Sequence, residues 1–181
     1  MTALEDAWEA ARLGEPWALR VVWETLAPQV AGYLRGRGAL EPDDLTSEVF
    51  LALFPRLPGV TGGVAGLRTL TFAIAHARLV DDLRRQSRRQ PTVELEPHHD
   101  TRTAPSAEQE ALASLEVDGV RRILSSLPDD QRDVLLMRLV GDLSVEQVAA
   151  AMGRSQGSVK QLQRRGLLAL KAQLADRGVT P

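Results

Sequence analysis

A stretch rich in proline and acidic residues divides this chain into two parts. Residues 91–110 hold three prolines and five acidic side chains, but only two large aliphatic ones, Val93 and Leu95. A segment of this kind cannot bury enough apolar surface to offset the entropy that it would lose on ordering. The pattern therefore predicts a flexible acidic linker, over residues 93–114, between two separately folded parts.

Both flanking parts have helical patterns. Neither shows the apolar/polar alternation of a strand, or an Asn-Gly or Asp-Gly hairpin turn. Apolar residues recur three or four positions apart instead, as at Leu45, Val49 and Leu53. A length of 181 residues suits two small domains. We therefore predict an all-α protein with helical domains over residues 1–92 and 115–178.

Glycine and proline positions predict where the helices begin and end. In the first part we expect a helix over residues 27–37, another from Pro42 to the residue before Pro55, and a long one over residues 67–89. Four glycines predict a loop over residues 58–66. In the second part we expect helices over residues 115–126, 129–139, 145–151 and 156–175.

Composition and motifs exclude several classes of function. The chain has no cysteine, which excludes a disulfide scaffold, a zinc finger and thiol catalysis. No apolar run approaches the roughly 20 residues of a membrane helix, and the acidic N-terminus lacks an export signal, so we expect no membrane insertion and a cytoplasmic location. Phosphate-binding, serine-hydrolase and metalloprotease motifs are absent. We expect no enzyme, with no catalytic residue, metal or cofactor.

The second part contains the spacing of a helix-turn-helix. Ser144 occupies the position of a helix N-cap. Small Ala149 falls where two helices would cross, Gly153 follows four residues later at a tight turn, and apolar Val159 follows six residues after that. Two helices joined by such a turn are typical of a DNA-binding unit.

The outward face of the second of these helices is basic. Between Glu146 and Asp176 the chain has five basic residues and no acid. Lys160 and Arg164 form a like-charged pair four residues apart, which is unfavourable without a nearby anion. Such side chains neutralise phosphates and donate to guanine in the major groove, and Gln161 can pair with adenine. A solvated basic face is the alternative, but the helix-turn-helix spacing favours DNA.

Two further charged clusters lie in the first part. Arg84, Arg85, Arg88 and Arg89 end the long helix, where they either complement the helix dipole or provide a second contact with a long anionic ligand. Acidic residues at 41, 43, 44 and 48 surround the start of an earlier helix. First-turn acids suit the helix dipole, and the cluster also suggests a protein-docking surface.

Four segments resemble bacterial extracytoplasmic-function (group IV) sigma factors of the sigma-70 family. AARLGEPWALRVVWETLAPQVAGYL resembles their first conserved helices, and EPDDLTSEVFLALF their core-polymerase-binding helix. LRTLTFAIAHARLVDDLRRQSRR is similar to the helix that melts and reads the −10 element. LSSLPDDQRDVLLMRLVGDLSVEQVAAAMGRSQGSVKQLQRRGLLALK resembles the domain that reads the −35 element. The resemblance covers residues 5–92 and 114–175.

The resemblance implies partners and roles. The partners are core RNA polymerase, promoter DNA with −35 and −10 elements about 16–18 base pairs apart, and an anti-sigma factor. The implied polymerase-binding residues are Asp43, Asp44, Leu45, Glu48, Val49 and Phe50. The implied −10 residues are His76, Ala77, Arg78, Arg84, Arg85 and Arg88. The implied −35 residues are Arg154, Ser155, Ser158, Lys160, Gln161, Arg164 and Arg165.

Three positions depart from the family pattern. Leu70 stands where a tryptophan is common, and Ala77 where a polar residue often lines the pocket for a flipped −10 base. Gly166 replaces a small alanine and is expected to loosen its helix by about 1 kcal/mol. Two other functions therefore stay open. One is a conventional helix-turn-helix regulator whose residues 1–92 sense a ligand or dimerise. The other is a degenerate sigma-like protein that acts only through protein partners.

Overall fold

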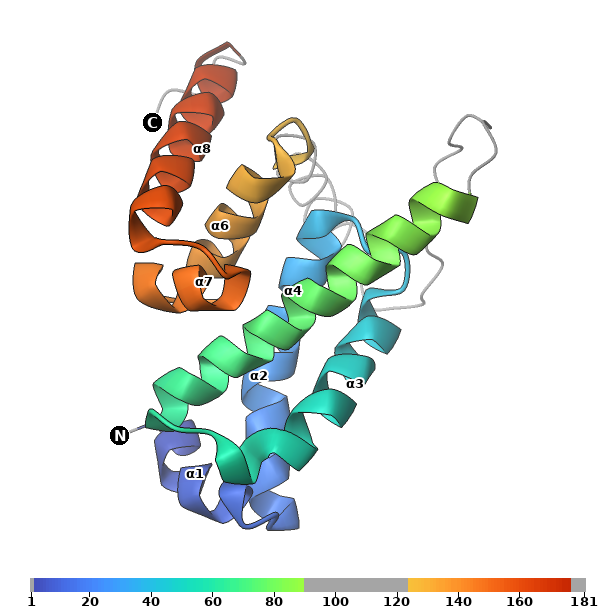
Figure 1. The fold of residues 1–181 in the computed structure, drawn as a ribbon, viewed down its shortest axis with the longest axis vertical. Helices are drawn as coiled ribbons and strands as arrows, with labels where there is room; N and C mark the ends of the chain where they lie inside the picture. The colour runs from blue at the N-terminus through green and yellow to red at the C-terminus, as the bar shows by residue number, and fades with distance from the viewer. Residues whose placement is uncertain (1, 90–123, 177–181) are drawn as a thin grey trace, which may run out of the picture.

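A computed structural model describes residues 2–89 and 124–176, and within these ranges every regular element is a helix (Figure 1). This confirms the all-α prediction. The predicted linker lies outside the described residues. The helix predicted over residues 115–126 also lies outside them as far as residue 123. The elements are α1 (Ala3–Arg12), α2 (Pro16–Arg37), α3 (Pro42–Leu53), the 3₁₀ helix η1 (Phe54–Gly59), α4 (Gly63–Arg89), α6 (Asp129–Leu139), α7 (Val145–Met152) and α8 (Gln156–Asp176).

The four helices α1 to α4 pack into one bundle in which α4 crosses α2 and α3 (Figure 1). Its core includes the fully buried side chains of Leu26, Tyr33, Phe50 and Phe72. The Phe50 ring lies 4.6 Å from that of Trp23, centroid to centroid. Within residues 2–89 and 124–176, none of the helices combines the length and apolarity that a bilayer crossing requires.

Helix α2 differs from the sequence prediction because it continues through a proline. We expected a helix that begins near residue 27, whereas α2 runs unbroken from Pro16 to Arg37 with Pro28 inside it. Proline removes one backbone hydrogen bond and normally breaks a helix. Here Pro28 is exposed, and Leu26 and Val30 on either side of it are buried. Packing of these neighbours against the bundle outweighs the lost hydrogen bond.

The helix-turn-helix has the predicted local geometry. The Ser144 hydroxyl accepts from the backbone N–H of Gln147 (3.1 Å), and the Gln147 side-chain oxygen accepts from the backbone N–H of Ser144 (2.7 Å). Gly153 ends α7 with a φ of 62°, in the left-handed region that favours glycine. Ala149 and Val159 are buried between the helices. The predicted cap, turn and inward-facing residues are therefore confirmed.

Gly166 has a packing role that the sequence did not reveal. A Cβ at this position would lie 2.8 Å from Cδ1 of Leu135, on α6, where α8 crosses that helix. The glycine thus permits a close crossing of the two helices, rather than only loosening α8 as its helix propensity suggests.

The start of α4 is a second, smaller difference from the sequence prediction: α4 begins at Gly63, inside the predicted loop.

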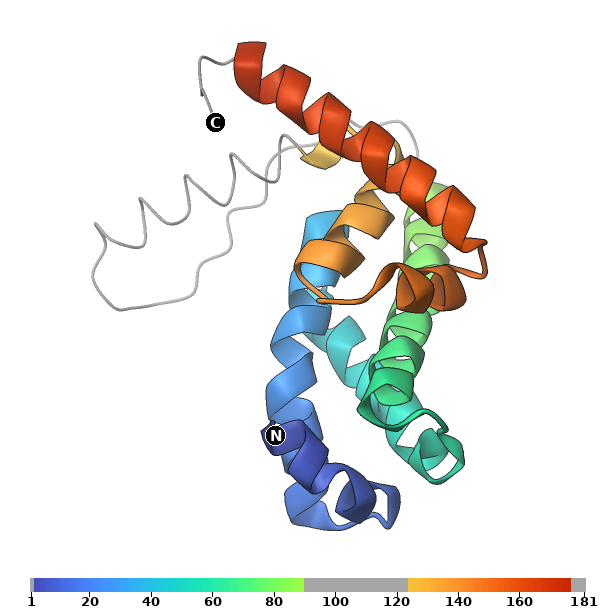
Figure 2. The same cartoon turned by 90° about the vertical axis from the view of Figure 1, so that its left-hand side faces the viewer.

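The two parts of the chain pack against each other. Helix α6 lies beside the C-terminal half of α2, and α7 lies over α4 (Figures 1 and 2). Glycines on α2 face side chains of the second part at close range. A Cβ on Gly32 would lie 2.9 Å from Cγ1 of Val140, and one on Gly36 would lie 2.8 Å from a methyl group of Leu136. The sequence had predicted two separately folded parts and no such interface.

Candidate nucleic-acid and polymerase surfaces

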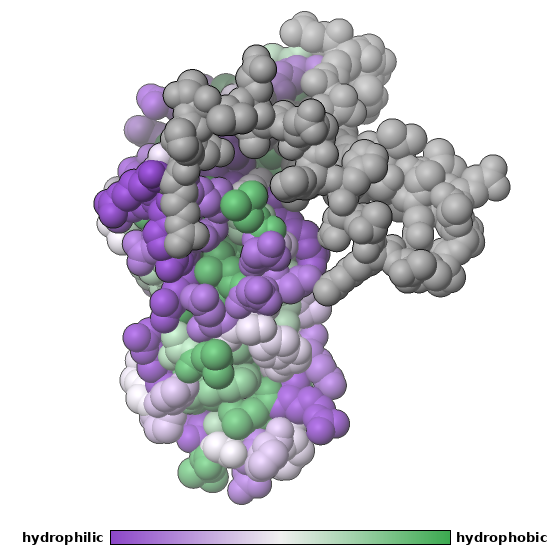
Figure 3. All heavy atoms as spheres, turned by 90° about the vertical axis from the view of Figure 1, so that its right-hand side faces the viewer, coloured by the Kyte–Doolittle hydropathy of each residue, from purple (hydrophilic) through white to green (hydrophobic). Residues whose placement is uncertain are grey.

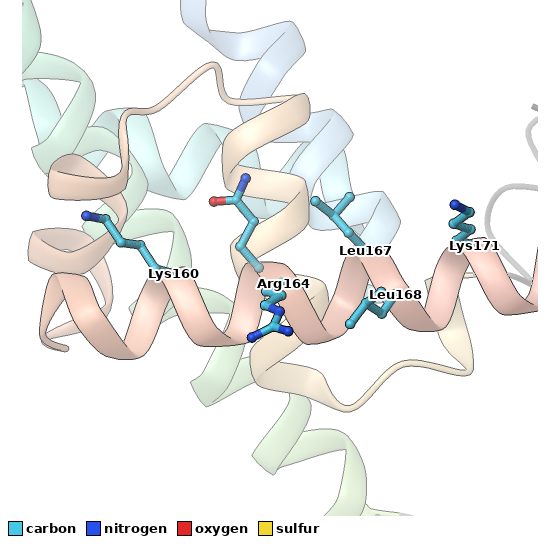
Figure 4. A pocket seen from close by; sticks show the side chains of 6 residues that line it. Lys160, Arg164, Leu167, Leu168 and Lys171 are labelled. Carbon is cyan, nitrogen blue, oxygen red and sulfur yellow. The ribbon is translucent and has the colours of Figure 1, made fainter.

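The start of α8 presents a cationic face. Lys160, Gln161, Arg164 and Arg165 are exposed on it. Among the residues that the structure describes, no acidic side chain pairs with Lys160, Arg164 or Arg165. Figure 4 shows Lys160, Arg164 and Lys171 spaced along α8, with Leu167 and Leu168 beside Arg164. Unpaired cations on the second helix of a helix-turn-helix are suited to a duplex phosphate backbone and major groove.

The three other −35 candidates have contacts within the second part of the chain. Arg154 lies at the turn with 38% of its side chain exposed and pairs with Asp130 on α6, at 2.6 Å. The Ser155 hydroxyl accepts from the backbone N–H of Ser158 (3.2 Å) and so caps α8, as predicted. Ser158 is partly buried. These residues lie at the same end of α8 as the exposed cations.

The predicted −10 helix, α4, borders two adjoining hollows. One has a volume of about 650 Å³ and lies between α4 and the segment from η1 to the glycine-rich loop. The other, of about 350 Å³, lies between α3 and α4. Leu70, Ala73 and Arg56 line both, and Ala77 and Arg78 line the smaller one. Sequence reasoning did not identify Arg56, which follows Pro55 in η1 without any motif to mark it.

His76 lines neither of these two hollows. Its Nδ1 lies 2.9 Å from the Tyr33 hydroxyl on α2, on the side of α4 that faces the second part of the chain. Of the predicted −10 base contacts, Ala77 and Arg78 thus lie together at the smaller hollow, whereas His76 lies elsewhere. The reason is helical spacing, since residues 76 and 77 lie about 100° apart around the helix.

The basic end of α4 is exposed. Arg84, Arg85 and Arg88 all reach solvent there. Arg84 also approaches Asp81 at 3.8 Å, one turn earlier on the same helix. Arg78 lies 3.8 Å from Glu48 of α3. Exposed pairs of this kind contribute little stability, so they leave these cations available to an anionic ligand.

The predicted polymerase-binding set divides into exposed and buried members. Asp43, Asp44 and Glu48 are exposed on α3. The three apolar members have side chains that lie in the bundle core rather than on the surface: Leu45, Val49 and Phe50. Their spacing of about four residues marks the inward face of the helix. Sequence reasoning missed Leu51, which is 74% exposed on the outer face of α3. Figure 3 shows the side of the molecule that carries α3, where apolar patches lie among hydrophilic side chains.

A polar cluster lies where α2, α4 and α6 meet. Arg37 and Asp133 are 5% and 2% exposed, and Nε of Arg37 donates to Oδ1 of Asp133 at 2.6 Å. Nη1 of Arg37 donates to Asp129 at 2.9 Å. The Tyr33 hydroxyl donates to the same Asp133 oxygen at 2.8 Å. Because the phenol has one hydrogen, its oxygen is left to accept from Nδ1–H of His76.

Comparison with known proteins assigns the chain to a family. The sequence model "Sigma-70, region 4" matches residues 123–172. The ECF RNA polymerase sigma factor SigD of Mycobacterium tuberculosis is 32% identical over 173 residues, which cover 91% of this chain and 81% of that protein. This chain belongs to the ECF RNA polymerase sigma factors. ShbA of Streptomyces griseus, of the same family, is 31% identical over 134 residues, covering 72% of this chain and 70% of ShbA.

Solved structures of sigma factors share the fold. CnrH, in complex with the cytosolic domain of CnrY, aligns with a TM-score of 0.70 and 20% identity over 97% of this chain and 99% of CnrH. RpoE, in complex with the anti-sigma factor NepR from Bartonella quintana, aligns with a TM-score of 0.65 and 16% identity over 86% of this chain and 96% of RpoE. This sigma factor therefore has the fold that the sequence predicted.

The family consists of transcription regulators rather than enzymes. Within the described ranges, no three or more His, Asp or Glu side chains gather as they would to hold a metal ion.

Tyr33 provides an optical probe of the polar cluster because it is the only tyrosine in the chain. Burial raises the pKa of Tyr33 well above its ordinary value of 10.0, and the Asp133 carboxylate raises it further. In a titration followed by tyrosinate absorbance, we expect a midpoint above that of free tyrosine. Because the neutral phenol is favoured in the folded protein, the stabilisation is present below pH 10 and is lost as the pH rises toward the folded pKa. A midpoint near 10 would contradict the buried placement.

Proposed function

We propose that this sigma factor directs core RNA polymerase to promoters by reading −35 duplex DNA with α8 and holding separated −10 DNA along α4. In this proposal residues 1–92 act as sigma region 2, residues 115–178 as region 4, and residues 93–114 connect them. The observation that carries the proposal is the exposed cationic face of α8, on the second helix of the helix-turn-helix, where no acidic side chain of the described residues pairs with Lys160, Arg164 or Arg165.

The −35 contacts are of two kinds. Residues at the turn and the first part of α8, Arg154, Ser155 and Ser158, are placed to meet the phosphate backbone. The exposed helix face carries the side chains that can donate to base edges: Lys160, Gln161, Arg164 and Arg165. Phosphate contacts fix register, and base contacts supply discrimination of about 1–3 kcal/mol for each bidentate pair.

The −10 contacts follow from the two hollows beside α4. A base removed from the stack needs stacking, apolar contact or hydrogen bonds to replace what it loses. Leu70 and Ala73 supply an apolar wall, and Arg56 supplies a cation shared by both hollows. The family's tryptophan position is Leu70 here, so an extruded base is held by apolar contact there. Exposed cations at the end of α4 contact the phosphates: Arg84, Arg85 and Arg88.

Polymerase binding is assigned to the exposed part of α3. Asp43, Asp44 and Glu48 form an acidic edge, and Leu51 projects an exposed aliphatic side chain from the same helix. Opposite charges across an interface steer association, and a central apolar contact excludes water. The buried side chains of Leu45, Val49 and Phe50 stabilise α3 by packing in the bundle core.

Loss of two acids on this edge is expected to weaken polymerase binding. We expect Asp44→Ala with Glu48→Ala to lower the affinity for core polymerase about tenfold, because rim charges act mainly on association. The measurement is fluorescence anisotropy of labelled protein titrated with core enzyme. The matched control is Asp6→Ala with Glu9→Ala, two exposed acids on α1. An equal loss in both double variants would contradict the assignment.

Control by a protein partner is the second element of the proposal. CnrH was solved with CnrY, and RpoE with the anti-sigma factor NepR. We expect a partner of this type to hold this chain inactive. Adding it in equimolar amount to a transcription reaction is expected to abolish transcripts that depend on this chain, and an unchanged transcript level would contradict that role.

Run-off transcription tests the main proposal. Core polymerase and a pool of random promoters are incubated with and without this protein. Transcripts that depend on it and share −35 and −10 elements about 16–18 base pairs apart would support the proposal. An absence of transcripts despite binding to core enzyme would overturn it in favour of a degenerate sigma-like protein. Binding to a palindromic site as a dimer, without polymerase, would favour a conventional regulator instead.

A further inference from the structure

The last turns of α4 carry a serine inside the cationic cluster. The sequence from Arg84 to Arg89 is RRQSRR, which contains Ser87. Ser87 is the only serine or threonine of the chain with arginine both two and three positions before it. The contacts proposed above for −10 DNA use the arginines and leave this serine without a role.

Ser87 is exposed, on a turn of α4 that extends beyond the start of α3 (Figure 1). Its hydroxyl donates to the carbonyl oxygen of Arg84 on the same helix, at 3.0 Å. Arg84, Arg85 and Arg88 are exposed too, and Gln86 is half-buried. Because no side chain of this turn lies in the bundle core, the turn unwinds into an extended strand at small cost, as helix ends commonly do.

An exposed serine preceded by two arginines suits a kinase with an acidic substrate groove. Guanidinium groups form charge-assisted, often bidentate hydrogen bonds with carboxylates, so arginines at fixed positions before a hydroxyl set the register of the bound strand. Ser47, which is exposed on α3, has acidic residues before it instead, at Asp43 and Asp44. An acidic groove repels that segment. Charge therefore distinguishes Ser87 from Ser47.

We propose that Ser87 is a phosphorylation site for an arginine-directed serine kinase, and that a phosphate there weakens the hold of α4 on −10 DNA. In this reaction Oγ of Ser87 attacks the γ-phosphorus of Mg²⁺-bound ATP, and the new Oγ–P bond replaces the bond from that phosphorus to the β,γ-bridging oxygen. ADP leaves with the bonding electron pair, and the hydroxyl proton passes to a carboxylate base of the kinase. The inference rests on the proposed function, because the phosphate affects transcription only if the end of α4 contacts DNA.

A phosphate at this position changes the charge of the end of α4. Phosphoserine carries about −1.5 to −2 charges near neutral pH and has three acceptor oxygens. Ser87 lies one turn after Arg84 and next to Arg88, so both guanidinium groups are within reach of the phosphate. Arg84 approaches Asp81 at 3.8 Å, an exposed contact that is weaker than a pair with phosphate. The three exposed arginines then keep about one net positive charge for DNA.

Phosphate transfer is tested first, on the full chain without polymerase or DNA. The probe is the catalytic subunit of cyclic-AMP-dependent protein kinase, an arginine-directed enzyme, with ATP and Mg²⁺, and mass spectrometry of proteolytic fragments locates the phosphate. We expect transfer to Ser87, none at that position in Ser87→Ala, and an initial rate about tenfold lower in Arg85→Gln. Ser47→Ala is the matched control and is expected to keep the wild-type rate. The absence of phosphate on Ser87, or an unchanged rate in Arg85→Gln, would overturn the inference.

The effect on DNA is measured with core polymerase bound to the phosphorylated chain. The readout is the anisotropy of a labelled single strand that carries the −10 element of a promoter found by run-off transcription. We expect phosphorylation to weaken binding about tenfold at low salt. The slope of log affinity against log salt is expected to fall by about 1.4, the value for two phosphate contacts with a single strand. Binding of a −35 duplex, which α8 reads, is the internal control and is expected to change less than about twofold.

The outcomes separate this inference from the proposed function. If the unphosphorylated complex does not hold the −10 strand, the proposed function of α4 fails and the release of DNA fails with it, whereas phosphate transfer to Ser87 is still measured. If the complex holds the strand equally with and without the phosphate, the effect of Ser87 on DNA is overturned while the proposed function stands.

Two variants of similar size test the role of charge without a kinase. We expect Ser87→Asp to weaken binding of the −10 strand about threefold, and Ser87→Asn to change it less than about twofold, because only the aspartate adds a negative charge beside the arginines. Equal binding by the two variants would overturn the claim that negative charge at this position releases the strand.

Discussion

Replacing Arg164 and Arg165 together with alanine is expected to lower promoter-dependent transcription about 100-fold, with polymerase affinity unchanged. Each lost contact to a base edge or phosphate costs about 1–3 kcal/mol, and two such losses add when the contacts are separate. Both side chains are exposed on α8, so their removal leaves no buried partner behind. The measurement is run-off transcription on one promoter, with core-enzyme binding measured in parallel by anisotropy.

Lys171 supplies the matched control for this double variant. It lies on the same helix and is exposed, but it stands two turns farther from the turn of the helix-turn-helix. We expect Lys171→Ala to change transcription less than about twofold, because only the first turns of such a helix enter the major groove. Equal losses in both variants would show that α8 acts through its overall charge rather than through a reading face.

Removing the carboxylate of Asp133 is expected to weaken the packing of residues 124–176 against residues 2–89. Truncating one partner of a buried charge pair costs about 3–5 kcal/mol, because the other charge is left buried and unpaired. In Asp133→Ala, Arg37 and Tyr33 both lose their acceptor. Arg37 recovers its hydration when the two parts separate. The destabilisation is therefore limited to the free energy with which the two parts associate, and we expect each part to keep its helices.

The rate of disulfide formation in a Gly36→Cys, Leu136→Cys double variant measures this effect, because a Cβ on Gly36 would lie 3.5 Å from Cγ of Leu136. In the Asp133→Ala background we expect the rate to fall about 100-fold or more, in proportion to the population in which the two parts are packed together. Asp130→Ala is the matched control, since Asp130 lies on the same helix and its pair with Arg154 is partly exposed. A surface pair of this kind contributes about 0–1 kcal/mol. An unchanged rate in Asp133→Ala would show that packing alone holds the interface.

Titration of Arg37 does not control its pairing with Asp133 near neutral pH. Burial alone would lower the pKa of Arg37, but the neighbouring carboxylates of Asp133 and Asp129 raise it above its usual value. The guanidinium therefore stays charged throughout the neutral range. Substitution of Arg37 or Asp133 breaks the pair, whereas a pH change near neutrality does not.

The amino-acid sequence by itself determined the local architecture of this protein. The bounds of α6, the Ser144 cap, the left-handed Gly153 and the cationic face of α8 all agree with sequence predictions. These features depend on residues a few positions apart, through helical periodicity, capping and turn geometry. The motifs that identify the sigma-factor family are of the same local kind.

Only the tertiary structure decided features that depend on distant partners. Continuation of α2 through Pro28 required the bundle packed around it. The burial of Leu45, Val49 and Phe50 required knowing which face of α3 meets the core, because an apolar stripe suits a core and a docking surface equally. Arg37 and Asp133 carry no motif, and their pairing becomes visible only when α2 and α6 are in contact. Local spacing cannot encode a contact across 96 positions, since that contact depends on how whole helices pack.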